Sequence, residues 1–160
     1  MSATTIDEVL DALVSELQDS ATLSYVNDDT IVKKSLWDDE PGPYENYAIV
    51  VALRNILPPV NRIAGVLEQA FEIDIVPYVN IHGATKEGSV GGATIRGVAY
   101  KGLNDVISDI FSVLRRNTLG DVLRTPGRAI EGGGVEPIGG ENAVAVRARL
   151  NYTAETRDTL

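Results

Sequence analysis

His82 is the only histidine in the chain, and it is the first residue whose chemistry could indicate a function. A zinc site requires three or four converging ligands, and no second histidine and no cysteine exists to join His82. A Ser-His-Asp nucleophilic site is formally open to it, but the G-x-S-x-G turn that presents such a serine does not occur. We therefore expect His82 to be a solvated or capping residue at a strand end.

Two other segments could bind phosphate or a cation. Gly91, Gly92 and Gly97 lack the G-x-G-x-x-G spacing, and no G-x-x-x-x-G-K-[ST] segment is present, so turns and flexibility explain these glycines better. The run Asp38-Asp39-Glu40, with Glu45 nearby, could hold Ca²⁺ or Mg²⁺. It lacks the alternating ligands and central glycine of an EF-hand loop, which favours a solvated acidic loop. The sequence predicts no catalytic residue, no metal site and no cofactor.

Aromatic and basic side chains are the remaining candidates for binding. Trp37, Tyr44 and Tyr47 flank a proline-rich loop, where they could anchor an interface or simply cover the edge of a core. Arg147 and Arg149 project from one face of an expected strand, where an ion pair across an interface and a solvated face fit equally well. These five residues are interface candidates.

The composition excludes several classes of function. The chain has 160 residues, which corresponds to one domain, and 23 acidic against 14 basic residues give a net charge of −9. This balance disfavours a basic nucleic-acid-binding face. The absence of cysteine excludes disulfides, thiolate zinc sites and cysteine nucleophiles. The N-terminus lacks the pattern of a secretory signal, and no apolar run approaches the roughly 18 residues of a membrane span, so we expect a soluble protein made in a cytoplasm.

Helical periodicity marks two elements. The first is a helix over Thr5 to Asp19, whose apolar residues recur at helical spacing and whose Thr5 and Glu8 have the spacing of a capping box. The second is an amphipathic helix over about 101–117, with arginines at its C-terminal end. We expect the second helix to pack on a sheet.

Strand patterns occupy much of the remaining chain. A buried strand is predicted over 47–57 and an alternating strand over about 70–82. Residues 60–70 are ambiguous between a helix and an extension of a long hairpin, and we favour the hairpin. Residues 23–26 and 30–36 could be short strands separated by a turn at 27–29, and residues 37–43 form a loop.

The last third of the chain is expected to end in strands. Residues 128–131 lead into a glycine run, and residues 144–153 alternate apolar and polar side chains, which predicts a strand with one buried side. A mobile glycine-rich loop is expected over about 83–97 and a frayed C-terminus over about 154–160. Together these elements predict a single α+β domain over residues 1–160, with an antiparallel or mixed sheet.

The order of these elements resembles that of tail terminator proteins, also called tail completion or neck proteins, of long-tailed bacteriophages and archaeal tailed viruses. The most telling segment is Asn117-Thr118-Leu119-Gly120, which looks like the asparagine-x-leucine-glycine segment that these proteins place after their second helix. The likeness covers most of the chain, although residues 22–46 and 58–70 contribute little to it. The other elements that carry it are the helix 6–17, the strands 47–53 and 71–81, the helix 103–114, and the final strand 143–152 followed by Arg157.

The resemblance implies a structural virion protein that is not an enzyme. It would form a homohexameric ring that caps the tail tube, between the tube protein and the head connector or stopper protein. Genome DNA would pass the lumen without specific binding, which suits an acidic chain, and no membrane would be involved. The ring would be assembled in the host cytoplasm and reside in the neck of the virion. The loop 83–97, with Lys86 and Arg96 as further interface candidates, would reach a neighbouring ring.

Two alternatives remain open from the sequence. The chain could be another neck component, a head-completion or stopper protein, which tend to be more helical or barrel-like. It could also be a small α+β enzyme or ligand-binding domain that uses the acidic loop 38–45 together with His82.

Overall fold

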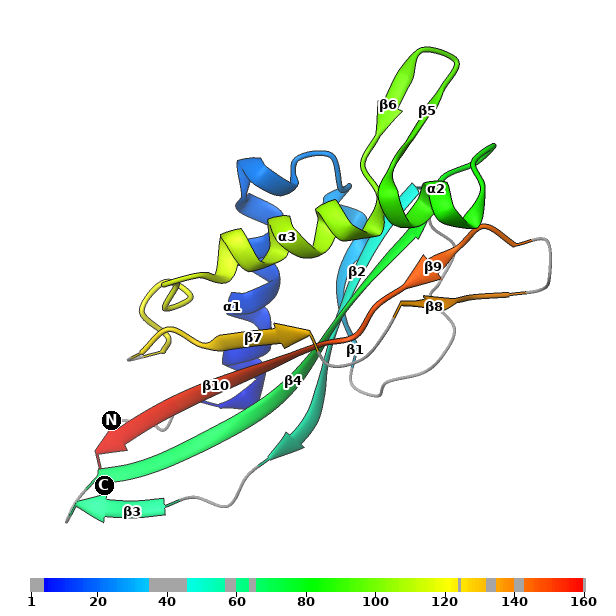
Figure 1. Ribbon diagram of the computed structural model, residues 1–160. Helices are drawn as coiled ribbons and strands as arrows, with labels where there is room; N and C mark the ends of the chain where they lie inside the picture. The colour runs from blue at the N-terminus through cyan, green and yellow to red at the C-terminus, as the bar shows by residue number, and fades with distance from the viewer. Residues whose placement is uncertain are drawn as a thin grey trace.

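A mixed β-sheet with helices against one face organises the chain (Figure 1). The structure is a computed structural model, and it describes residues 5–34, 46–56, 60–63, 66–123, 125–131, 135–139 and 143–159. The strand order of the main sheet is β1-β2-β4-β10-β7, with β3 and β9 also paired to β4 and β8 paired to β9. Among the described residues, β1 and β2 run parallel, and the other pairs of this sheet are antiparallel. The predicted α+β class is confirmed.

The N-terminal helix α1 spans Ile6–Asp19 and begins where the sequence predicts. The Thr5 side chain accepts a 3.2 Å hydrogen bond from the Glu8 backbone N–H, which satisfies one of the free donors at the helix start. One apolar stripe of the helix faces the sheet and is buried, comprising Val9, Leu10, Leu13 and Leu17.

Residues 21–30 form two 3₁₀ turns, η1 (Ala21–Leu23) and η2 (Asp28–Thr30), so the predicted strand over 23–26 is wrong. Ser20 Oγ and Asn27 Oδ1 each accept a hydrogen bond from the backbone two residues later, which starts a turn in both places. Leu23 and Val26 are both buried, at a spacing of three that suits a helical turn better than a strand. The second predicted strand exists as β1 (Ile31–Lys34).

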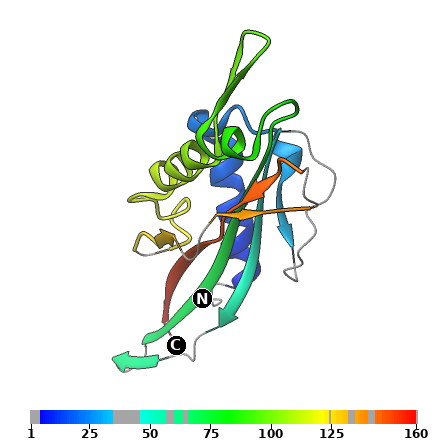
Figure 2. The same ribbon diagram turned by 45° about the vertical axis from the view of Figure 1, so that its right-hand side comes forward.

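The long hairpin predicted across residues 60–70 is confirmed. Strand β2 (Asn46–Ile56) pairs with β4 (Val66–Asn80), and the short β3 (Val60–Ile63) pairs with the first residues of β4. In both views β3 and the ends of β4 and β10 extend past the helices as a narrow ribbon (Figures 1 and 2). We call this segment, residues 60–63, 66–70 and 155–159, the ribbon.

The C-terminal strand β10 (Leu150–Thr159) is longer than predicted, and the expected fraying over 154–160 is wrong for residues 154–159. These residues pair with Phe71 back to Val66, because β4 begins earlier than predicted and provides the template. Strand β9 (Val146–Arg147) continues in the same register on β4. The interruption lies opposite Pro77, which accepts from Ala148 N–H at 3.2 Å but has no N–H to return.

Residues 86–100 are helical and extended rather than the predicted loop over 83–97. Helix α2 (Lys86–Gly91) begins at Thr85, whose side chain accepts from Gly88 N–H at 3.1 Å. Strands β5 (Ala93–Ile95) and β6 (Val98–Tyr100) form a hairpin that projects from the body of the molecule (Figure 1). Of the glycines in this segment, Gly83 lies in the turn after β4, Gly88 and Gly91 lie within α2, Gly92 follows α2, and Gly97 is in the hairpin turn.

Helix α3 (Leu103–Leu114) lies within the predicted second helix and packs with α1 on the same face of the sheet (Figure 1). Its buried stripe comprises Leu103, Val106, Ile107, Ile110 and Leu114. After it the chain turns sharply at Asn117, whose Oδ1 accepts from Leu119 N–H at 2.8 Å and whose Nδ2 donates to Glu16 Oε2 at 3.0 Å. Leu119 is thereby turned into the core. The chain continues into β7 (Arg128–Glu131) and β8 (Glu136–Pro137).

Both faces of the central strands are buried. The main core lies between the sheet and the helices. The opposite face carries a smaller cluster of Ala48, Val50, Val76 and Tyr78, with Val32 and Ile138 packed against it.

Candidate assembly surfaces

Of the predicted aromatic interface candidates, Tyr47 alone lies within the described residues. Trp37 and Tyr44, like the acidic run 38–40 and Glu45, lie outside the described residues. Tyr47 is only 6% exposed, and its hydroxyl donates a 2.9 Å hydrogen bond to the Lys101 carbonyl. Its ring also contacts that of Tyr25 edge-on, with centroids 5.0 Å apart. Tyr47 therefore belongs to the core, which is the second of the two roles left open by the sequence.

Arg147 forms an ion pair within its own chain. Its Nε and Nη2 atoms each lie 3.0 Å from Glu136 Oε2, and the side chain is only 13% exposed. This pair joins β8 to β9, because Glu136 is directly opposite Arg147 in the strand register. The prediction that Arg147 faces outward from a one-sided strand is compatible with this position, but its charge is already paired.

Arg149 lies near a buried carboxylate on the outer sheet face. Asp74, on β4, is buried, and its Oδ1 is 4.0 Å from Arg54 Nη1. Loss of solvation raises the pKa of the Asp74 carboxyl above its usual value, and the positive charges of Arg54 and Arg149 oppose this rise. Asn151 is opposite Asp74 in the sheet, and no hydrogen-bond partner reaches either Oδ1 atom within the described chain. These polar side chains lie on the sheet face opposite to the helices, on neighbouring strands β4 and β10.

A second polar cluster joins the segment after η1 to α3. The Tyr25 hydroxyl donates a 2.7 Å hydrogen bond to Asp109 Oδ2, and Lys101 Nζ lies 3.0 Å from the same oxygen. Lys101 also lies 4.7 Å from the centre of the Tyr25 ring. Burial, together with the bond to Asp109, raises the pKa of Tyr25, so the phenol remains protonated and cannot act as a base near neutral pH. These contacts hold Tyr25 and Lys101 against Asp109 of α3 within one chain.

The described residues provide little for a cofactor or metal. No group of three or more histidine, aspartate or glutamate side chains among them is close enough to hold a metal ion. His82 is exposed just after β4. No helix in the described part of the chain is long and apolar enough to cross a membrane.

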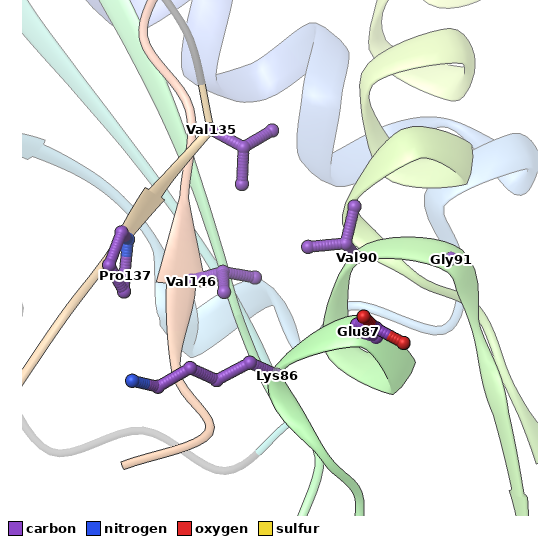
Figure 3. Close-up of a pocket in the computed structure, with 7 residues that line it drawn as sticks. All are labelled: Lys86, Glu87, Val90, Gly91, Val135, Pro137 and Val146. Carbon is purple, nitrogen blue, oxygen red and sulfur yellow. The ribbon is translucent and has the colours of Figure 1, made fainter. Parts of the chain in front are cut away.

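An apolar hollow lies between α2 and the β8–β9 pair, and Lys86 is on its rim (Figure 3). Its volume is about 370 Å³, and its lining residues are Lys86, Glu87, Val90, Gly91, Val135, Pro137 and Val146. Val135 is 36% exposed, which leaves apolar surface open to water. Figure 3 shows the Lys86 side chain extending past Val146 toward Pro137, whereas the Glu87 side chain stays close to α2.

Arg96 occupies the tip of the β5–β6 hairpin. The two-residue turn has positive φ at both positions, 51° at Arg96 and 81° at Gly97, as a type I′ turn requires. Glycine adopts this conformation freely, whereas arginine does so at a local cost. Val98, directly after the turn, is 52% exposed and is one of three large apolar side chains that the described residues leave open.

The ribbon presents open strand edges. Beyond Thr153, no described strand pairs with the outer edge of β10, and β3 pairs only with β4. Free backbone donors and acceptors at such edges are suited to pairing with another chain.

The sequence predicts Lys86 and Arg96 as interface candidates, and it does not single out Glu87, Val98 or Val135. The available signal was the pair Arg96-Gly97 between two short runs of β-forming residues, a weaker hairpin signature than Asn-Gly. In comparisons with known proteins, no protein-family model matches the chain, and no curated protein sequence matches it either.

Proposed function

We propose that this chain is a structural subunit of a tailed virus, a tail terminator that forms a homohexameric ring on the end of the tail tube. In the neck of the virion the ring joins the tail to the head connector or stopper protein. One feature above all supports this function: the domain projects an ordered element at each end of its sheet, the β5–β6 hairpin at one and the ribbon at the other (Figure 1).

A subunit of this kind must make two sorts of contact. Neighbours around the ring meet through two unlike surfaces, and the rings above and below meet the ends of the subunit. The ribbon has open strand edges, and the hairpin carries exposed apolar surface. Both features are costly for an isolated subunit and are explained by assembly.

The ion pairs and hydrogen bonds inside the domain also favour a structural role. Arg147 with Glu136, and Lys101 with Tyr25 and Asp109, use their charges to hold elements of the same chain together. The asparagine turn at Asn117, which carries the resemblance to tail terminators, has the same kind of role because it joins α3 to α1.

The charge of the chain agrees with a ring around DNA. A net charge of −9 on each subunit gives six copies a strongly negative surface, which repels phosphate and lets the genome pass without sticking.

Two measurements test the proposal together. Light scattering after size-exclusion chromatography measures the mass of the purified chain, and electron microscopy locates a tagged copy in virions, with untagged virions as the control. We expect a ring of six subunits in the neck. A monomer in solution agrees with the proposal if rings appear on tails, whereas the absence of both a ring and a neck position contradicts it.

A further inference from the structure

We propose that the tip of the β5–β6 hairpin of one subunit inserts into the apolar hollow between α2 and β8–β9 of the next copy. This contact rests on the proposed ring, and it specifies which surfaces hold neighbouring subunits together. Val98 is the apolar anchor and Arg96 the charged one.

The base of the hairpin is packed against the rest of the domain. At its base, a side chain on Gly102 would collide with the backbone of Val90, Gly91 and Gly92, so the end of α2 and the start of α3 are in direct contact. Ile95 and Tyr100 pack against the main core. The turn residues Arg96 and Gly97 are exposed, as are Thr94, Val98 and Ala99, and the type I′ turn holds Arg96 at a φ that arginine rarely adopts. Such local strain is typical of sites that are retained for function.

The hollow matches the tip in size and chemistry. A volume of about 370 Å³ corresponds to roughly a dozen waters at about 30 Å³ each, which is enough for the valine side chain and the turn next to it. Val90, Val135, Pro137 and Val146 give it apolar walls. Inserting Val98 would cover exposed valines on both partners, which is favourable in proportion to the apolar area removed from water.

Charge fixes the orientation of the contact. Glu87 is on the rim of the hollow, and Arg96 is two residues before Val98 on the tip. When Val98 occupies the hollow, Arg96 can reach the Glu87 carboxylate. The Lys86 ammonium lies on the Pro137 side of the hollow, apart from the Glu87 carboxylate (Figure 3).

The segment that fills the hollow comes from a second copy of the chain, because every subunit carries both a hairpin tip and a hollow. The hairpin projects away from β8 and β9, so the tip does not reach the hollow of its own chain (Figures 1 and 2). A contact between two unlike surfaces of identical subunits passes from each copy to the next and closes into a ring when the rotation fits.

Disulfide formation between subunits tests the contact, and the absence of natural cysteines removes any background. A tagged Val98→Cys chain is mixed with an untagged Val135→Cys chain in assembled rings, or on tails if the purified chain is monomeric. The control mixture replaces the second chain with Ile56→Cys, whose native residue is 48% exposed on β2. Mild oxidation is expected to give at least tenfold more tagged–untagged dimer in the first mixture than in the control.

Charge reversal supplies a second readout. Arg96→Glu or Glu87→Arg alone is expected to lower the yield of the crosslink roughly threefold to tenfold, and the two reversals together to restore it. Thr94→Glu, an exposed change on the same hairpin, is the control and is expected to have little effect.

The outcomes separate this contact from the proposed function. Rings in the neck without preferential 98–135 crosslinking overturn the contact and leave the tail role standing. Preferential crosslinking in rings that are absent from the neck supports the contact and overturns the tail role. No ring in solution or on tails, with no crosslink, overturns both.

Discussion

The side-chain amide of Asn117 donates a 3.0 Å hydrogen bond to Glu16 Oε2 and thereby joins the end of α3 to the last turn of α1. The same amide nitrogen donates to the Val113 carbonyl at 3.0 Å, and Oδ1 accepts from Leu119 N–H. One side chain thus ends a helix, starts a turn and ties together two elements 101 residues apart. Neither aspartate nor serine offers the same donors and acceptor.

Asn117→Ala is expected to destabilise the fold by about 1–3 kcal/mol, because several partly buried hydrogen bonds are lost together. Asn117→Asp keeps the acceptor for Leu119 but places a second carboxylate beside Glu16, so it should be the more harmful change at pH 7. Urea unfolding of both variants, alone and with Glu16→Gln, measures the effect. Glu16→Gln should relieve part of the cost of Asn117→Asp, and an equal cost in both backgrounds would contradict the assigned contact.

Gly127→Ala is expected to destabilise the protein by about 1–3 kcal/mol through overpacking. A Cβ at this position would collide with the ring and hydroxyl of Tyr152, which is fully buried on β10. That burial also raises the pKa of Tyr152 to about 12. Gly91→Ala is the matched control, because a Cβ there meets nothing within 4 Å. Thermal unfolding compares the two, and equal melting temperatures would refute the close packing of Gly127.

Asp74→Asn is expected to raise the melting temperature at pH 7 and to change it little below pH 4. Burial holds the pKa of this carboxyl above its usual 3.8, so the folded protein retains a proton that the unfolded chain releases. The free energy of unfolding therefore falls as pH rises from about 4 through the folded-state pKa, and asparagine removes this loss. Glu155→Gln, an exposed change on β10, is the control. A pH-independent difference between Asp74→Asn and the native chain would contradict this assignment.

Local sequence signals predicted the elements that depend on local interactions. The spacing of apolar residues and the Thr5 cap indicated α1 correctly, and alternation along residues 71–81 indicated the central strand. The sequence predictions are wrong where contacts between segments far apart in the sequence determine the secondary structure. Residues 154–159 are strand because residues 66–71 lie beside them, and Pro77 interrupts β9 and β10 from across the sheet.

The candidate surfaces were less predictable for the same reason. The sequence leaves Tyr47 open between core and interface, and its burial together with its bond to the Lys101 carbonyl, 54 residues away, places it in the core. The residues that line the hollow, among them Glu87, Val135 and Val146, come from three separate segments of the chain. The density of glycines over residues 83–97 predicts a loop, whereas in the structure Thr85 starts a helix and Arg96-Gly97 closes a hairpin.

Ending the chain after Thr153 tests the structure of the C-terminus directly. A frayed segment could be removed without cost, whereas β10 buries Ala154 and Thr156 and continues the pairing with β4 to Val66. We expect the truncation to cost about 2 kcal/mol or more, since it removes both backbone pairing and buried surface. It also uncovers the edge of β4 at the ribbon, so the truncated chain should aggregate on heating. Ending the chain after Thr159 is the control, and thermal unfolding with light scattering measures both. Equal stability of the two truncated chains would mean that residues 154–159 contribute nothing to the fold.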